Sequence, residues 1–280
     1  MSARGIALNV ADPEPEEFPD FTHFWFEPTK NEGDPQIVYA LLDGASIAGA
    51  YRFKLTRTRG VIIEIENHLF PRRDIHRLGV APLTSMFWYG EYPSSHAEDW
   101  RPEVHDTDGL ALWNGAGERI WRPINNPPRI VTSSFFDINP KGFGLSQRDR
   151  NYDHYLDGVN YHLRPSCWIE PLGDWGRGAV QLVEIPTDDE IYDNVVAFWL
   201  PEQPVKGGDS LTFAYRMHWA EFEPFYPALD LARCVATRIG RGGQPGQPRP
   251  KGVVKFAVEF DGASLGSIPW GVRPEVVVTA

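Results

Sequence analysis

The chain has 280 residues, a formal net charge of -11 at pH 7 and a hydrophobic fraction of 42%, so it is long enough and apolar enough to bury a full core. The negative charge repels phosphate groups, which argues against nucleic acid and anionic membrane surfaces as partners and favours a neutral ligand. With 26 Gly, 25 Pro, 10 Trp, 10 Tyr and 16 Phe, the composition favours short strands joined by turns over long helices. We therefore predict an all-β fold.

The compartment is not indicated by the residues themselves. No apolar run reaches the roughly 20 residues that a membrane-spanning helix needs, so stable membrane insertion is not expected. The first residues lack the charged and then apolar layout of a secretory signal, which taken alone favours the cytoplasm. Cys167 and Cys234 could form one disulfide, but two cysteines so far apart do not identify the redox environment.

Short β-type runs bounded by turn residues recur along the chain. We predict strands within residues 36–44, 49–58, 60–70, 109–121, 179–185, 194–201 and 211–219. Apolar and polar residues alternate from Leu211 to Met217, as they do in a strand with one face on a core and the other in water. The segment NGAGE at residues 114–118 predicts a hairpin loop. Helices are expected to be short, for example around residues 18–26 and 227–233.

One strong shift in composition occurs near the end of the chain. Residues 238–252 carry Gly or Pro at every second or third position, which predicts an irregular linker or a long functional loop. One further strand is expected within residues 252–262 and another within 273–280, too few for a stable domain. We therefore expect a first domain over residues 1–220, a linker and loop over 221–250, and an incomplete unit over 251–280.

An uncompensated acidic segment lies at residues 184–193. The pattern from Thr187 to Glu190 matches a capping box at the start of a helix, which accounts for most of the acids without any function. In such a helix Asp193 would share a face with Glu190, and the repulsion would make one of the two hold its proton more tightly. A carboxylic acid of that kind is a general acid near neutral pH. The alternative is a solvated acidic turn.

A second acidic segment, RPEVHDTDGLALW, covers residues 101–113. Asp108 and Gly109 favour a turn or loop in which Asp side chains cap backbone groups. His105 next to Asp106 indicates a second interpretation, in which this segment belongs to a catalytic site. Glycoside hydrolysis by inversion needs two carboxylates from separate strands, one acid and one base, with room for a water between them.

A third polar region lies within residues 133–157. It contains a planar amide, guanidinium groups and phenols, which are the groups that line sugar sites, although an ordinary polar loop with internal ion pairs fits equally well. The candidate sugar-binding residues here are Gln147, Arg148, Arg150, Tyr152 and Tyr155. Trp175 is one of several tryptophans that could stack on a sugar ring, although most tryptophans belong to the core.

Other chemistries find little support in the sequence. There is no G-x-S-x-G elbow, no CxxC and no HExxH, and the eight His lack metal-ligand spacing. Gly142-Phe143-Gly144 lacks the third glycine and the setting of a dinucleotide loop. Residues 106–109 resemble a calcium loop only faintly, because the third acidic ligand and the terminal Glu are missing, so calcium is a minor alternative. No cofactor and no metal are expected.

Several segments together resemble the family of osmoregulated periplasmic glucan biosynthesis proteins G and D, the MdoG/OpgG family. They occur in the same order as in that family and run through most of the chain: LGVAPLTSMFWYGE, RPEVHDTDGL, IWRPINNP, NPKGFGLSQRDRNYDHYLD, YHLRPSCWIEPLGDWGRGAVQLVEIPTDDE and DNVVAFWLPEQP. The resemblance implies a large β-sandwich of the galactose-mutarotase-like type followed by an immunoglobulin-like sandwich. Because the family has a longer segment before this one, we expect both parts to be truncated here.

The resemblance also implies a function. Such proteins are periplasmic, act in making glucans with a β-1,2-linked backbone, and include endo-acting, inverting β-1,2-glucanases. Asp193 then resembles the general acid, Glu190 a neighbour in the site, and Asp106 the carboxylate on the base side. His105 is expected beside the substrate. The Gly-rich loop at residues 238–250 falls where the family covers the cleft, from a partner subunit in a homodimer. A carbohydrate-binding scaffold without hydrolysis is the alternative.

Overall fold

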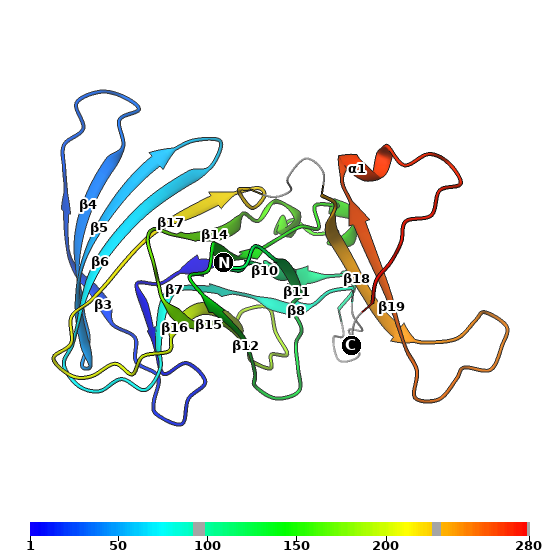
Figure 1. Cartoon of the computed structure of the whole chain (residues 1–280), viewed down its shortest axis with the longest axis horizontal. Helices are drawn as coiled ribbons and strands as arrows, with labels where there is room; N and C mark the ends of the chain where they lie inside the picture. Colours follow the sequence, from blue (N-terminus) through cyan, green and yellow to red (C-terminus); the bar gives the residue numbers. More distant parts are fainter. Residues whose placement is uncertain (92–98, 226–230, 279–280) are drawn as a thin grey trace. The chain divides into compact units, whose positions relative to one another are not determined.

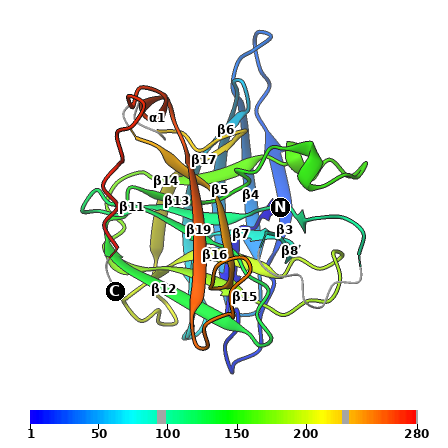
Figure 2. The same ribbon diagram turned by 90° about the vertical axis from the view of Figure 1, so that its right-hand side faces the viewer.

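The computed structural model describes residues 1–91, 99–225 and 231–278, and it divides into two compact units, Met1–Pro224 and Phe225–Ala280. Almost all regular structure is antiparallel β-sheet, so the all-β prediction is confirmed. The first unit holds two main sheets whose strands are visible in Figure 1, and Figure 2 shows the same strands from the side. The smaller main sheet has the order β1-β7-β16-β15-β12, with β2 also paired to β7.

The larger main sheet has the order β11-β10-β13-β14-β17-β6-β5-β4-β3. The bounds of the strands in the smaller sheet are β1 Ser2–Ala3, β2 Ile6–Leu8, β7 Leu78–Ser85, β12 Val131–Ile138, β15 Arg177–Glu184 and β16 Val195–Pro201. Those of the larger sheet are β3 Asp20–Phe26, β4 Gln36–Asp43, β5 Ile47–Arg57, β6 Val61–Pro71, β10 Gly109–Trp113, β11 Arg119–Pro123, β13 Gly142–Ser146, β14 Ser166–Pro171 and β17 Leu211–Ala220. A short pair of strands, β8 Phe87–Tyr89 and β9 Val104–His105, and two 3-10 turns, η1 Tyr152–His154 and η2 Tyr161–Leu163, complete the unit.

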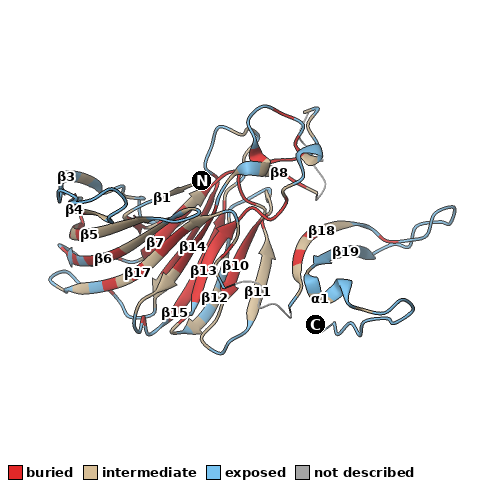
Figure 3. Ribbon diagram, turned by 90° about the horizontal axis from the view of Figure 1, so that it is seen from above, coloured by how far each residue is buried: buried red, intermediate tan, exposed pale blue. Residues whose placement is uncertain are grey.

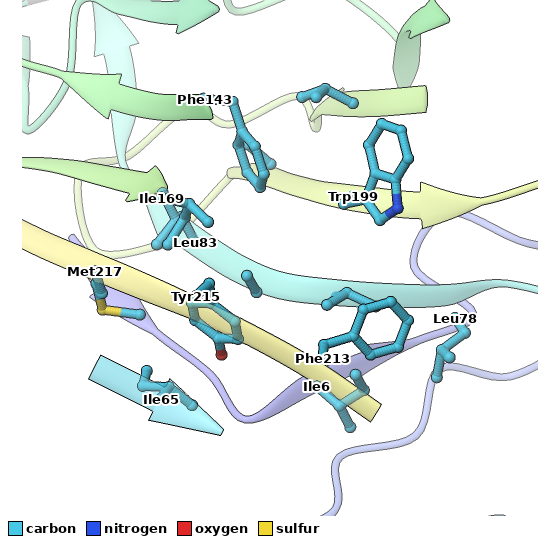
Figure 4. Close-up of a cluster of buried hydrophobic side chains, with 14 of the residues drawn as sticks. Ile6, Ile65, Leu78, Leu83, Phe143, Ile169, Trp199, Phe213, Tyr215 and Met217 are labelled. Atoms are coloured by element: carbon cyan, nitrogen blue, oxygen red, sulfur yellow. The ribbon is translucent and has the colours of Figure 1, made fainter. Parts of the chain in front are cut away.

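The two main sheets share one hydrophobic core and therefore form a sandwich. The alternation predicted for β17 is seen in the burial of Phe213, Tyr215 and Met217, which face Leu83 and Trp199 of the smaller sheet within the core cluster drawn in Figure 4. Figure 3 shows buried residues concentrated on the strands of the sandwich, whereas β3 and β4 are mostly exposed or half-buried. That the sandwich is of the galactose-mutarotase-like type stays a prediction.

Most predicted strands are found, and the NGAGE hairpin loop joins β10 to β11 as expected. Three local predictions were wrong. Residues 20–26 of the segment 18–26 form strand β3 instead of a helix, residues 273–278 form no strand, and residues 187–190 form a turn without a helix. The helix expected at residues 227–233 lies partly outside the described residues, and Arg233 begins a strand.

The second unit, taken by itself, is a β-hairpin of β18 Arg233–Arg241 and β19 Val254–Asp261 followed by the single turn α1 Ala263–Gly266. The first four residues of the Gly/Pro-rich segment extend β18, so the expectation that the whole segment is irregular was wrong. Its remaining residues connect the two strands. An immunoglobulin-like identity for this unit stays a prediction.

Candidate functional site: a carboxylate cluster at one end of strand β7

Asp106 and Asp193 are brought to the same end of strand β7 by strand pairing. Val195 at the start of β16 pairs with Ser85 at the end of β7, and Phe87 in β8 pairs with His105. The backbone N–H of Asp106 consequently donates to the carbonyl of Met86 at 2.9 Å. Thr84 Oγ1 donates to the Asp193 carboxylate at 3.2 Å. The two carboxylates therefore lie on segments that flank residues 84–86.

The Asp106 carboxylate is largely buried and faces a guanidinium group. Its Oδ1 atom lies 2.8 Å from Nε of Arg164. The Ser2 hydroxyl lies 2.7 Å from Thr84 Oγ1, the atom that donates to Asp193. Asp106 is thus held in place by an ion pair with Arg164.

Glu190 is also held by a cation, but by a different one. Arg101 donates to its two carboxylate oxygens at 2.9 and 3.2 Å, and the Tyr161 hydroxyl donates to Oε2 at 2.5 Å. Burial acts to raise the pKa of Glu190, but the hydrogen bonds from Arg101 and Tyr161 outweigh it, so the pKa lies below its ordinary value. Of the pair Glu190 and Asp193, one of which was expected to hold its proton more tightly, Glu190 is therefore the one that does not.

Arg101 is shared among three carboxylates. Besides Glu190 it contacts Asp99 at 2.8 Å and Asp157 at 2.9 Å, and its own side chain is only 9% exposed. The hydrogen bond from Arg101 lowers the pKa of Asp99 to about 2, against the opposing effect of burial. This one guanidinium therefore compensates much of the negative charge beside the site.

Asp193 differs from the other two carboxylates because its side chain remains 42% exposed. The nearest cation is Arg4, at 3.7 Å and itself 57% exposed, so the pair is weak in water. The turn before it is fixed by Asn194, which is buried and hydrogen-bonds both the N–H and the C=O of Phe87 as well as the carbonyl of Ile185. Asp193 is therefore an accessible carboxylate on a rigid support.

Two residues of the segment YHLRPS, Tyr161 and Arg164, connect the carboxylates, and the sequence analysis did not single them out. The guanidinium of Arg164 pairs with Asp106 and lies 5.4 Å from the centre of the Tyr161 ring. Tyr161 in turn donates to Glu190. The only signal for them in the sequence was that the segment belonged to the stretches of family resemblance.

Comparison with known proteins decides the family. The model of the family described as "Periplasmic glucan biosynthesis protein, MdoG" matches residues 1–280. The chain belongs to the MdoG family. It is 60% identical over 282 residues to "Glucans biosynthesis protein D 2" of Ralstonia nicotianae (strain ATCC BAA-1114 / GMI1000), covering 100% of this chain and 52% of that protein.

Two further relatives of the same family are somewhat more distant. "Glucans biosynthesis protein D" of Stenotrophomonas maltophilia (strain K279a) is 50% identical over 281 residues, which is 100% of this chain and 52% of the relative. The protein of that name from Xanthomonas axonopodis pv. citri (strain 306) is 50% identical over 269 residues, which is 96% of this chain and 50% of the relative. The MdoG-family chain thus spans about half the length of the curated relatives it matches. No helix in the described ranges has the length and apolar character to cross a membrane.

The remaining predicted binding residues of this MdoG-family chain are mostly buried. His105 is 1% exposed, with Nδ1 3.0 Å from Gln147 Oε1 and Nε2 2.9 Å from Glu103. The Gln147 amide nitrogen faces the carbonyls of His105 and Tyr161, so its oxygen must face the imidazole. Both ring nitrogens therefore face acceptors, and His105 is a buried imidazolium.

This protonation state agrees with the electrostatics of the pocket around His105. Burial acts to lower its pKa, but the hydrogen bond and charge of Glu103 outweigh it, so the pKa of His105 lies above its ordinary value. Tyr155 is fully buried, and its hydroxyl accepts from the Gln147 amide at 2.8 Å. His105 and Tyr155 are thus buried side chains that are connected through Gln147.

The two predicted arginines fix the loops that carry the site. Arg148 lies 3.6 Å over the Trp121 ring and is paired with Glu223 at 3.0 Å, with both side chains buried. Arg150 donates to the carbonyls of His162 and Arg164 at 3.0 and 2.5 Å, which holds the η2 turn. Neither guanidinium is brought next to Asp193 by a described contact.

Tyr152 and Trp175 lie in contrasting places. Tyr152 is 48% exposed and packs edge-on against His162 near the η2 turn. Trp175 is 7% exposed and packs on Trp199 in the sandwich core, with its indole N–H donating to Ala214. The structure does not bring Trp175 to the carboxylate cluster, and its role in sugar binding stays a prediction without a supporting contact.

Asp108 has the backbone-capping role that its sequence context predicted. Its Oδ2 atom accepts from the N–H groups of Arg148 and Asp149 at 2.9 and 2.8 Å. Burial raises the pKa of Asp108 to about 6, against the lowering effect of His105 and of these donors. The following residue, Gly109, is required by close packing, since a Cβ atom there would lie 2.1 Å from the Trp121 ring.

Among the described residues, one group has the geometry to surround a metal ion. Ligand atoms of Glu103, Asp149 and His154 all lie within 4.8 Å of one another. However, His105 already bonds Glu103, and His154 Nδ1 lies 2.5 Å from Asp149. Hydrogen bonds therefore account for this group without an ion.

Proposed function

We propose that this chain carries the carboxylates of a periplasmic protein that cleaves β-1,2-linked glucan internally with inversion of the anomeric centre. Its membership of a family of periplasmic glucan biosynthesis proteins supports the ligand and the compartment. The observation that supports this reaction is that an exposed Asp193 and a buried, ion-paired Asp106 lie at the same end of β7. Inversion needs two carboxylates in different surroundings.

In this mechanism Asp193 donates its proton to the departing glycosidic oxygen. Asp193 is the carboxylate of the cluster that bulk water reaches most easily, so it can be protonated again after each turnover. A water on the opposite face of the sugar attacks the anomeric carbon, and its proton passes to Asp106 through a chain of hydroxyl groups or waters. Glu190 remains an anion and binds sugar hydroxyls, because Arg101 and Tyr161 hold its negative charge in place.

A non-catalytic glucan-binding scaffold is the second candidate. The ion pair of Asp106 with Arg164 favours it, since the guanidinium already occupies one oxygen of this carboxylate. The same polar groups would then only hold glucan hydroxyls. A homodimer is a further proposal from the family resemblance, and light scattering coupled to size-exclusion chromatography measures it.

The variant Asp193→Asn separates the two candidates. Wild-type protein is expected to shorten linear β-1,2-glucan, seen as new reducing ends, and proton NMR is expected to show the inverted anomer first. Asp193→Asn should lose at least about a hundredfold in rate, the range for removing a general acid, while retaining glucan binding in an affinity gel. The control is Asp188→Asn, an exposed acid of the same turn, which should cleave normally. Binding without any shortening by the wild type would support the scaffold.

A further inference from the structure

A cavity separate from the carboxylate cluster lies at the other end of the smaller sheet. Its volume is about 670 Å³, within the range of small-ligand sites. Its walls come from the segments 73–76 and 200–206 and from the ends of β12 and β15. Strand β16 runs from Val195, two residues after Asp193, to Pro201 in the wall. At ~3.3 Å per residue the two sites are about 20 Å apart along this strand.

Several charged groups around the cavity form ion pairs that are partly open to solvent. Lys206 pairs with Asp74 at 2.8 Å, and Arg73 pairs with Glu17 at 3.5 Å. Glu202 pairs with Arg177 at 2.9 Å. Hydroxyl groups of a ligand can donate to these carboxylates and accept from these N–H groups at the same time. The wall therefore suits a neutral ligand that is rich in hydroxyls.

An exposed aromatic ring stands at the edge of the cavity. Phe136 on β12 is 86% exposed, and it lies on the exposed face of a strand whose residues alternate between half-buried and exposed. Its cross-strand neighbour is Ala179, and the adjacent wall residue is Gly178. Ala179 is a small neighbour of the ring, whereas the space at Gly178 is filled by the Trp199 side chain and the Leu200 carbonyl. A flat apolar ring next to polar donors and acceptors is the arrangement that binds the face of a pyranose.

We propose that this cavity is a second saccharide site that holds a neutral β-1,2-linked glucose segment by stacking on Phe136. The inference rests on the proposed glucan ligand and deepens it, because one chain of glucan could occupy the cavity and the carboxylate cluster together. A long glucan chain then stays bound in the cavity while another part of the same chain lies at Asp193. A fragment too short to reach both sites would gain no affinity from the second one.

The test compares Phe136→Ala with a matched control on the same face of the same strand, Ile138→Ala, which is 52% exposed and outside the cavity. Isothermal titration with a linear β-1,2-gluco-oligosaccharide is carried out in the Asp193→Asn background, so that the ligand stays intact. Phe136→Ala should raise the dissociation constant about tenfold, equal to about 1.4 kcal/mol, and Ile138→Ala should leave it unchanged. Phe136→Trp should restore binding.

The outcomes separate this inference from the proposed hydrolysis. Equal affinity of Phe136→Ala and wild type would overturn the second site, even if glucan is cleaved. Phe136-dependent binding by a protein that cleaves nothing would retain the second site and refute the hydrolytic function. In an active enzyme, Phe136→Ala should raise KM for long glucan while kcat stays the same. An equal KM for long glucan would also contradict the inference.

Discussion

Replacing Arg101 with Met should destabilise the protein strongly. Arg101 is 9% exposed and faces Asp99, Asp157 and Glu190, whose side chains are 14%, 7% and 31% exposed. Removing one partner of a buried ion pair costs about 3–5 kcal/mol, because the remaining charge is left uncompensated. Since Glu190 is partly screened by water, we expect the lower end, about 3 kcal/mol at pH 7. For a unit of this size that equals a fall in Tm of about 6–12 °C.

The loss should depend on pH with a definite sign. The pKa values of Asp99 and Glu190 are lowered in the folded protein, that of Asp99 to about 2, so their ion pairs stabilise the wild type fully above pH ~5. This stabilisation disappears as the pH falls through the folded pKa values. In Arg101→Met the same acids become protonated at higher pH, which relieves the uncompensated charge. The difference in free energy of unfolding between the two proteins should therefore shrink between pH 5 and pH 2.

Urea unfolding followed by tryptophan fluorescence at pH 7, 5 and 3 measures both effects. The control is Arg177→Met, which removes the exposed pair with Glu202 and should cost less than about 1 kcal/mol at every pH. A loss for Arg101→Met of under 1 kcal/mol at pH 7 would refute the reasoning, because the buried charges would then be compensated by other groups. A loss that is the same at all three pH values would refute the electrostatic cause.

Two other predictions concern residues beside the site. Burial raises the pKa of Asp108 to about 6, so ionisation of this residue destabilises the wild type as the pH rises from 4 to 7. The free energy of unfolding of Asp108→Asn, measured in urea, should therefore increase relative to that of the wild type by up to about 3 kcal/mol over this range. A difference that is constant with pH would contradict this. Gly109→Ala places a Cβ atom 2.1 Å from the Trp121 ring and should cost about 1–3 kcal/mol through the forced shift, with a change in near-ultraviolet circular dichroism, whereas an unchanged spectrum and stability would show that the ring has room to move.

Local patterns predicted the strands well where one face is buried and the other is exposed. Strand β17 shows this alternation clearly. Strand β3 does not, because it lies at the edge of the larger sheet and most of its residues are exposed on both faces. Its aromatic residues favour a strand by propensity, but the period of two that identifies a strand is missing. The helix predicted there followed from this lack of a pattern.

The turn at residues 187–190 was misread for a related reason. Thr187 accepts from the N–H of Asp189 at 3.2 Å, as it would at a helix start. The direction of the chain is instead set by the Asn194 side chain, which accepts from the N–H of Phe87 and donates to its C=O, 107 residues away. A capping pattern in the sequence cannot distinguish a helix from such a turn.

The site was predicted only in part, because its acids cluster in the sequence and its cations do not. Asp106, Glu190 and Asp193 lie within acidic segments that attract attention by themselves. Arg101 reaches Glu190 across 89 residues and Tyr161 reaches it across 29. Their partners are set by sheet topology, which local periodicity does not contain. The carboxylates could therefore be proposed from the sequence, whereas the groups that control their charge could not.

The side-chain amide of Gln147 has one orientation that satisfies its neighbours. Its nitrogen points at two carbonyl oxygens and its oxygen at the His105 imidazolium. Glutamate has nearly the same shape and is one base change away in the genetic code, yet a carboxylate oxygen in place of that nitrogen would meet the carbonyls as a repelling acceptor. Exchange of glutamine for glutamate, which is harmless on most protein surfaces, is therefore expected to destabilise this protein at position 147.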